Sequence, residues 1–258
     1  MEWRKPQKER KKTMSKIAKM ENGQPEIYLA VQGEGKTIGK PMVFVRFSLC
    51  NLHCNFCDTF YTWNFEHTPW EHDFAPKCSI SKEQIDMTEE EIVAYIKKVA
   101  APNKAVVFTG GEPMLHGKAI LRIIQLLGKG WYFEIETNGT IPISQELLDQ
   151  IDQVNCSPKL ASSGNPLDKR FNYDVLSAIN RAGGIFKFVI KDDVDLQEVE
   201  KLIKSVPLNH EQIYLMPCGI TRKEILEGSI HLNNVCMQTG YNMSTRLQVI
   251  LYDNKRAV

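Results

Sequence analysis

The sequence predicts an α/β fold, in which a parallel sheet curls into a partial, open (βα)6-type barrel. After Gly23-Gln24-Pro25, short apolar runs alternate with amphipathic helical patterns, which is the order typical of βαβ units. Roughly six such units are too few to close an eight-stranded barrel, so we expect the sheet to stay open. Polar motifs follow the first four predicted strands, where such barrels carry their functional loops.

Buried parallel strands are expected where a short run is rich in Val, Ile, Leu and Phe. The first such run, Met42–Ser48, leads directly into a cluster of cysteines. Later runs of the same kind complete the predicted sheet: Ala105–Gly111, Trp131–Gly139, Gln153–Lys159, Ile185–Asp192, Gln212–Gly219 and Thr245–Tyr252.

Amphipathic helices are predicted between these strands. Thr88–Ala100 begins with a capping box, because Thr88 can cap the first turn and Glu91 follows three residues later. Lys118–Gly130 ends in glycines that suit a left-handed cap. The other predicted helices are Ser144–Ile151, Asn172–Ala182, Leu196–Val206 and Arg222–Met237.

The composition is that of an ordinary globular protein, with 43% hydrophobic and 24% charged residues. No apolar run reaches the roughly 18 residues of a membrane span, and no apolar leader begins the chain, so we expect neither insertion nor secretion. Seven unevenly spaced cysteines favour a reducing compartment. We therefore expect a cytoplasmic protein.

Charge separates two regions of the chain. Residues 1–20 carry eight Lys/Arg and two Glu, whereas the remainder has 24 basic and 29 acidic residues. We interpret residues 1–24 as a basic, disordered extension and residues 25–258 as one folded domain, with a variable loop or insertion near 65–86. The extension could contact nucleic acid, but the acidic domain offers no matching basic field, so no nucleic acid partner is expected.

Three cysteines, Cys50, Cys54 and Cys57, lie within eight residues in the spacing CxxxCxxC. Thiolates suit zinc or iron–sulfur clusters, but a structural zinc site usually takes four ligands. Three thiolates on one loop can instead hold three irons of a 4Fe–4S cluster and leave the fourth iron open to another ligand. The alternatives are a zinc site completed by a distant residue, or three thiols that only pack.

This spacing after the first strand of a partial barrel resembles the radical S-adenosylmethionine (SAM) superfamily over most of residues 42–192. The resemblance implies that a 4Fe–4S cluster on the three cysteines binds SAM and generates a 5′-deoxyadenosyl radical. Thr109–Pro113 (TGGEP) is similar to the motif that receives the methionine amino group. Asn138 is one of the residues that the resemblance places at SAM, although the alternative is that it only shapes an Asn-Gly turn. The implied SAM contacts are Phe56, Asp58, Gly111, Glu112, Asn138, Ser157, Pro158 and Lys159.

Four further stretches resemble the 7-carboxy-7-deazaguanine synthase family, which makes the deazapurine precursor of queuosine. They are Val31–Arg46, Cys57–Trp63, Ser157–Lys159 and Asn254–Val258, so the resemblance covers nearly the whole chain after residue 25. It implies an enzyme, a carbon–nitrogen lyase that regenerates SAM. The implied substrate is 6-carboxy-5,6,7,8-tetrahydropterin, which becomes 7-carboxy-7-deazaguanine with loss of ammonia.

The same resemblance implies the residues that contact the substrate and a magnesium ion. Arg46 would pair with the substrate carboxylate, although a surface ion pair is the alternative for this residue. Thr59 matches a Mg²⁺ ligand, although its neighbours alone also suit an Asp-Thr turn or a helix cap. The full set of implied substrate contacts is Val31, Gln32, Gly33, Glu34, Arg46, Thr109 and, through its carboxylate, Val258.

A homodimer and an electron donor such as flavodoxin or ferredoxin are also implied by the resemblance. A glycyl-radical-enzyme activase would share the cysteine spacing, but not the Gln32–Gly35 stretch, Thr59 or the Asn254–Val258 ending. A non-catalytic metal-cluster protein that binds RNA through its basic extension would leave TGGEP, Ser157–Lys159 and Arg46 without a role. The sequence therefore favours the deazaguanine synthase.

Overall fold

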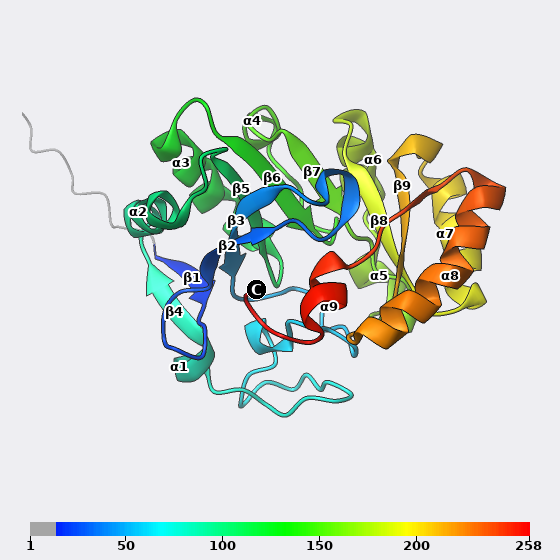
Figure 1. Ribbon diagram of the computed structural model, residues 1–258, viewed down its shortest axis with the longest axis horizontal. Helices are drawn as coiled ribbons and strands as arrows, with labels where there is room; N and C mark the ends of the chain where they lie inside the picture. The colour runs from blue at the N-terminus through cyan, green and yellow to red at the C-terminus, as the bar shows by residue number, and fades with distance from the viewer. Residues whose placement is uncertain (1–13) are drawn as a thin grey trace, which may run out of the picture.

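The computed structural model describes residues 14–258, and the strands of this part of the chain form one curved sheet (Figure 1). The strands are β1 Ser15–Ala18, β2 Ile27–Val31, β3 Pro41–Phe47, β4 Gln84–Met87, β5 Ala105–Gly110, β6 Tyr132–Thr137, β7 Gln153–Cys156, β8 Ile185–Ile190, β9 Ile213–Pro217 and β10 Asn242–Met243. The helices are α1 Ile80–Glu83, α2 Glu89–Val99, α3 Gly117–Leu127, α4 Gln145–Leu148, α5 Leu167–Arg170, α6 Tyr173–Arg181, α7 Asp193–Ser205, α8 Arg222–Thr239 and α9 Leu247–Tyr252.

The order of the strands confirms the predicted open (βα)6-type barrel. Strands β3, β5, β6, β7, β8 and β9 lie side by side and run parallel, with helices in the connections between them. In the described chain the full order is β10-β9-β8-β7-β6-β5-β3-β1-β4, with β2 paired to β3, and the two end strands do not meet. The sheet therefore stays open, and one side of the barrel is free for other segments.

Side chains alternate between the two faces of the sheet, so its convex face is apolar, and its concave face carries the charged residues beside a small apolar cluster of Met42, Ala105 and Val107. On β6, Phe133 and Ile135 pack into a core with α2 and α3, whereas Glu134 and Glu136 point to the concave face. A second core joins β7, β8 and β9 to α6, α7 and α8. Burial of apolar side chains under the helices thus leaves the inside of the barrel to charged residues.

Local signals in the sequence account for the helix boundaries. Thr88 Oγ1 accepts a hydrogen bond from the Glu91 amide, and the Glu91 side chain accepts one from the Thr88 amide, so the predicted capping box begins α2. Gly128 ends α3 with φ +78° and ψ −166°, so glycine ends the helix as expected, but not in the left-handed cap that we predicted. The predicted helices between 144 and 239 are all present, and α4 is shorter than expected.

The expectation that residues 1–24 form a disordered extension is wrong for β1. Ile17 pairs with Phe47 of β3 and Ile85 of β4, and its side chain is fully buried in the core. Ser15-Lys16-Ile17-Ala18 has two polar residues followed by two apolar ones, so it lacks the alternation that indicates a strand, although β1 lies between β3 and β4 in the sheet. Residues 1–13 lie outside the described residues, so the disorder expected for them stays a prediction.

The expected strand Thr245–Tyr252 is also wrong, because Leu247–Tyr252 forms helix α9. Short apolar runs do not distinguish a strand from a helix by their period. The edge of β9 is paired with β10, a two-residue strand that lies just before this segment in the chain. Helix α9 instead lies across the open side of the barrel, and the chain end runs from it to the centre of the molecule (Figure 1).

The expected loop at residues 65–86 is only partly irregular. It closes on itself through a bridge between Phe65 and Cys78, and it ends in α1 and β4, of which β4 pairs with β1. Among the described residues, no helix is long and apolar enough to cross a membrane.

Candidate active site

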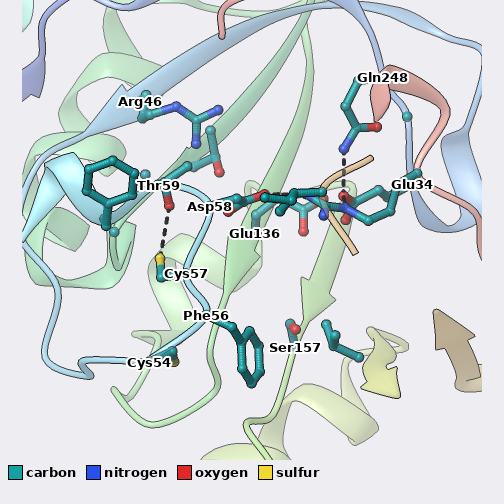
Figure 2. A pocket seen from close by; sticks show the side chains of 18 of the residues that line it. Glu34, Arg46, Cys54, Phe56, Cys57, Asp58, Thr59, Glu136, Ser157 and Gln248 are labelled. Atoms are coloured by element: carbon teal, nitrogen blue, oxygen red, sulfur yellow. Dashed lines mark hydrogen bonds and ion pairs between the residues drawn. The ribbon is translucent and has the colours of Figure 1, made fainter. Parts of the chain in front are cut away.

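A cavity of about 790 Å³ occupies the concave side of the sheet, and it gathers nearly all of the predicted site residues. In Figure 2 the cysteine loop with Phe56 lies on one side of this cavity, and Glu34 and Gln248 lie on the other. Glu112 and Pro158 are the predicted site residues that do not line it. The predicted residues that do are Val31, Gln32, Gly33, Glu34, Arg46, Cys50, Cys54, Phe56, Cys57, Asp58, Thr59, Thr109, Gly111, Asn138, Ser157, Lys159 and Val258.

The cysteine loop follows β3 and is held against the glycines that follow β5. A Cβ at Gly111 would lie 2.2 Å from the Leu49 carbonyl oxygen and 2.9 Å from the Cys50 Cβ, so only glycine permits this approach. The Glu112 amide donates to the Leu49 carbonyl oxygen at 2.9 Å and fixes the two segments together. The TGGEP motif therefore sets the position of the first cysteine.

The three thiols are free and face the same cavity, which fits the donor set of an open iron–sulfur cluster. The described residues contain no group of three ligating side chains around a single ion, whereas each iron of such a cluster takes one thiolate. The Asn165 side-chain amide donates to Cys54 Sγ at 3.3 Å. Burial raises the pKa of the Cys54 thiol to about 11, and bound iron would supply the positive charge that keeps it deprotonated.

Glu112 of the TGGEP motif holds two loops of the site together. Its carboxylate is fully buried outside the cavity, and it accepts hydrogen bonds from Thr137 Oγ1 at 2.8 Å and from the Asn138 amide at 2.7 Å. The Met114 amide donates to the same group at 3.0 Å. Glu112 thus ties the loop after β5 to the loop after β6, so that both stay at one edge of the cavity.

Asn138 lines the cavity and also shapes the turn after β6. Its Oδ1 accepts from the Thr140 amide at 3.0 Å, and its Nδ2 donates to Asn51 Oδ1 at 3.0 Å. Gly139 next to it has φ +74°, and a Cβ there would lie 2.5 Å from Cys156 Sγ. The structure therefore supports the turn-shaping role and links the turn to the cysteine loop through Asn51.

Arg46 reaches the cavity from β3, where it is paired to a residue that the sequence did not single out. Its Nε donates to Glu26 Oε1 at 2.6 Å, and its Nη2 donates to the Tyr28 hydroxyl at 3.4 Å. Glu26 is fully buried, so this is a buried ion pair, unlike the surface pair considered as the alternative. Arg46 Nη1 has no hydrogen-bond acceptor among residues 14–258, and Arg46 lines the cavity in Figure 2.

Glu34 lies at the centre of a charged network on the opposite side of the cavity. Lys187 Nζ donates to Glu34 Oε2 at 2.9 Å and to Glu136 Oε2 at 2.7 Å. Arg246 Nε donates to the other Glu34 oxygen at 3.3 Å, and Gln248 Nε2 does so at 2.8 Å. Burial opposes ionisation of Glu34, but Lys187 and Arg246 outweigh it and hold the pKa of this carboxyl well below its ordinary range.

Arg246 also joins this network to the cysteine loop, because its Nη2 donates to Asp58. Asp58 therefore pairs with a cation of the protein, and it also lines the cavity in which the resemblance implies a SAM contact. Gly33 sits directly under α9, where a Cβ would lie 1.8 Å from Gln248 Oε1. The segment from Arg246 to Gln248 thus bridges the predicted substrate loop and the predicted cluster loop.

Several of these residues were missed by reasoning from the sequence. Lys187 stands inside the apolar run IFKFVIKD and Glu136 inside YFEIET, so a charge at an inward position of a buried strand could have revealed both. Arg246 and Gln248 gave no such signal, because the segment that carries them was read as a strand. Glu26 precedes a short exposed strand and carries no local pattern at all.

Comparison with known proteins identifies the family. The family model of the Radical SAM superfamily matches residues 44–187. A 7-carboxy-7-deazaguanine synthase of Halobacterium salinarum is 32% identical over 251 residues, which cover 89% of this chain and 90% of that protein. The chain belongs to the 7-carboxy-7-deazaguanine synthase family. A relative of the same name from Bacteroides thetaiotaomicron is 42% identical over 134 residues, which cover 52% of this chain and 59% of that protein.

A solved structure of this family has the same fold. QueE from Escherichia coli superposes with a TM-score of 0.65 at 22% identity, over 91% of this chain and 94% of that chain. Membership in the 7-carboxy-7-deazaguanine synthase family confirms the predicted radical SAM chemistry and its two cofactors, a 4Fe–4S cluster and SAM. The free thiols Cys50, Cys54 and Cys57 are the donor set that fits the cluster.

Proposed function

We propose that this chain converts 6-carboxy-5,6,7,8-tetrahydropterin to 7-carboxy-7-deazaguanine with release of ammonia. The observation that carries the proposal is the lining of one cavity, to which the three thiols of the cysteine loop, Arg46 and the charged network of Glu34 each contribute a separate part. That arrangement suits a substrate that is a polar bicyclic ring with one carboxylate. The reaction is redox-neutral: every carbon atom is kept, the pyrazine ring contracts as C6 exchanges its bond to N5 for a bond to the ring carbon C4a, and N5 leaves as ammonia.

When bound, the cluster and SAM supply the 5′-deoxyadenosyl radical that takes a hydrogen atom from the substrate. The protein orients the substrate for this step. Arg46 offers its free Nη1 and the edge of its guanidinium to the substrate carboxylate, since Nε is already held by Glu26. Glu34 stays ionised beside Lys187 and presents an acceptor to the ring N–H groups of the pterin.

Thr59 is proposed as a ligand of Mg²⁺ at the substrate. Its hydroxyl lies 3.5 Å from Cys57 Sγ and faces the cavity between the cysteine loop and Arg46 (Figure 2). A magnesium ion with few protein ligands completes its octahedron with water and substrate oxygens. We therefore propose that the metal binds together with the substrate, and that Thr109 lies against the same ligand from β5.

Phe56, Gly111, Asn138, Ser157 and Lys159 are proposed to contact SAM, because they line the cavity around the cysteine side. Lys159 Nζ donates to Ser157 Oγ at 2.9 Å, so the two side chains act as one polar unit. Val31, Gln32, Gly33 and Val258 are proposed to complete the substrate site. A homodimer, a flavodoxin or ferredoxin as electron donor, and a cytoplasmic location belong to the same proposal.

The test is an anaerobic assay of the reconstituted protein with dithionite, SAM, Mg²⁺ and 6-carboxytetrahydropterin, followed by mass spectrometry. We expect 7-carboxy-7-deazaguanine and ammonia in equal amounts. Formation of 5′-deoxyadenosine alone would reject the substrate and keep the radical chemistry. No product from protein with a full cluster would reject the proposed reaction.

A further inference from the structure

The last residues of the chain are held over the cavity by one arginine. Arg256 Nε and Nη2 donate to Glu26 Oε2 at 2.9 and 2.7 Å, and Arg256 Nη1 donates to Glu83 Oε2 at 2.9 Å. Arg256 Nη2 also donates to the Lys19 carbonyl oxygen at 2.5 Å, and the guanidinium lies 3.3 Å above the centre of the Tyr61 ring. The donors of Arg256 are thus directed to three separate parts of the fold.

The residues next to Arg256 form part of the cavity wall. Asn254 and Val258 both line the cavity, on either side of this anchor. Asp253 and Ala257 have φ +52° and +56°, left-handed conformations that side chains other than glycine rarely adopt. Such conformations persist only where surrounding contacts enforce them. The Arg222 amide donates to Asp253 Oδ1 at 2.8 Å, and Ala257 directly follows the anchored Arg256.

Glu26 connects this anchor to Arg46. Oε1 of Glu26 accepts from Arg46 Nε at 2.6 Å and from the Tyr61 hydroxyl at 2.9 Å, while Oε2 accepts, among residues 14–258, only from Arg256. A guanidinium prefers to bind both oxygens of a carboxylate. Because Arg256 occupies Oε2, Arg46 binds by Nε alone and keeps its Nη1 toward the cavity.

We infer that Arg256 is a positioning residue for substrate binding, which fixes the cavity wall at Asn254–Val258 and, through Glu26, holds Arg46 in the orientation that recognises a carboxylate. This inference rests on the proposed function for the identity of the substrate. Loss of Arg256 would leave Oε2 of a fully buried carboxylate without a cation. Arg46 would then rotate onto both oxygens of Glu26 and withdraw from the cavity.

The first part of the test needs no substrate. Endoproteinase Lys-C cuts after Lys255, and cleavage there requires the anchored segment to open. We expect Arg256→Gln to be cut about tenfold faster than the wild type, since a charge-assisted contact is lost, and Arg256→Lys to fall between them. Synthetic peptides of each sequence correct for protease preference, and Arg122→Gln, on an exposed arginine, is the matched control. Equal cleavage of wild type and Arg256→Gln would overturn the anchor.

The second part measures the link to Arg46. Anaerobic calorimetry gives the affinity for 6-carboxytetrahydropterin and for tetrahydropterin without the carboxyl group. We expect the preference for the carboxylated compound to fall about tenfold in Arg256→Gln, because Arg46 has turned away. Faster cleavage with an unchanged preference would overturn the coupling through Glu26, and so would a crystal structure of this variant in which Arg46 has not moved. If even the wild type binds neither pterin, the proposed substrate is wrong, while cleavage and the crystal structure still decide the inference.

Discussion

Lys187 Nζ lies 2.9 Å from Oε2 of Glu34, a residue 153 positions earlier in the chain. The lysine comes from the middle of β8, and its side chain is 1% exposed. A buried charge of this kind is tolerated only when it is paired, so the two segments hold each other in place. This pair, with Glu136 on the second side of Lys187, fixes the floor of the cavity.

Replacing Lys187 should therefore destabilise the fold. Lys187→Met removes the cation between two carboxylates that are 17 and 18% exposed, and we expect a loss of about 3–5 kcal/mol in the free energy of unfolding. Urea denaturation of the apoprotein measures it. Lys223→Met, at an exposed pair with Glu227, should change stability by under about 1 kcal/mol. Equal losses in the free energy of unfolding for Lys187→Met and Lys223→Met would contradict a stabilising role of the buried pair.

Acid should weaken this network through Glu34. Burial alone would raise the pKa of Glu34, but Lys187 and Arg246 lower it below its ordinary 4.5. A lowered pKa means that ionised Glu34 stabilises the fold above pH 4.5 and that this contribution is lost as the pH falls below it. The stability difference between wild type and Glu34→Gln should therefore shrink as the pH drops from about 7 to about 3. A difference independent of pH would argue against an ionised Glu34.

Cys54→Ala should abolish the iron–sulfur cluster. Cys54 is one of three thiols on the loop after β3 that line the cavity, whereas the Cys78 thiol lies in the loop between Phe65 and β4 and does not line it. Anaerobic reconstitution followed by visible absorbance and iron analysis measures the cluster. Cys78→Ala should reconstitute as the wild type does. A normal spectrum for Cys54→Ala would remove this residue from the ligand set.

Gly111→Ala should reduce cluster content without touching a ligand. The new Cβ would lie 2.2 Å from the Leu49 backbone oxygen, which can yield only if the cysteine loop moves. Gly117→Ala is the control, because its Cβ would meet the flexible end of Met114 at 3.0 Å and Leu147 Cδ2 at 4.0 Å, and no described backbone atom outside its own helix. Iron content per protein after reconstitution is the measurement. Full iron loading of Gly111→Ala would show that the loop tolerates the shift.

Thr59→Ala should weaken turnover and its dependence on Mg²⁺ while leaving cluster content normal. Thr59→Ser keeps the hydroxyl and should retain most of the magnesium response. Rates at a series of Mg²⁺ concentrations compare the three proteins. An unchanged magnesium response in Thr59→Ala would exclude its hydroxyl as a ligand.

The sequence predicts the sheet well because its strands are buried on both faces. Runs such as AVVFTGG and IFKFVIKD are apolar over a length that suits a strand, and the structure places both in the parallel core. The polar loops after these strands meet at one edge, as the topology of a parallel barrel requires. The order of strands and motifs along the chain is therefore sufficient to place the cluster loop beside the TGGEP motif.

The charged partners of the site could not be predicted in the same way. Periodicity shows which face a residue occupies, but not which distant residue lies opposite. Glu26 and Arg256 are 230 positions apart, and neither belongs to a regular pattern. Helix α9 was missed for a related reason, since its apolar run has a length that suits either a strand or a helix, and only tertiary contacts such as those with Gly33 and Glu34 show where it packs. Contacts made across the open side of the barrel are decided by tertiary packing alone.

The position of α9 has a consequence for how the protein is made. Arg246, which begins the segment over the cavity, follows Asp58 of the cysteine loop by 188 residues. At a synthesis rate of about 5–20 residues per second, the ribosome needs about 10–40 s to travel from one to the other. During that interval the three cysteines have emerged while the cover of the cavity does not yet exist. Iron and sulfide thus have access to the three cysteines of the nascent chain before the segment that begins at Arg246 covers the cavity.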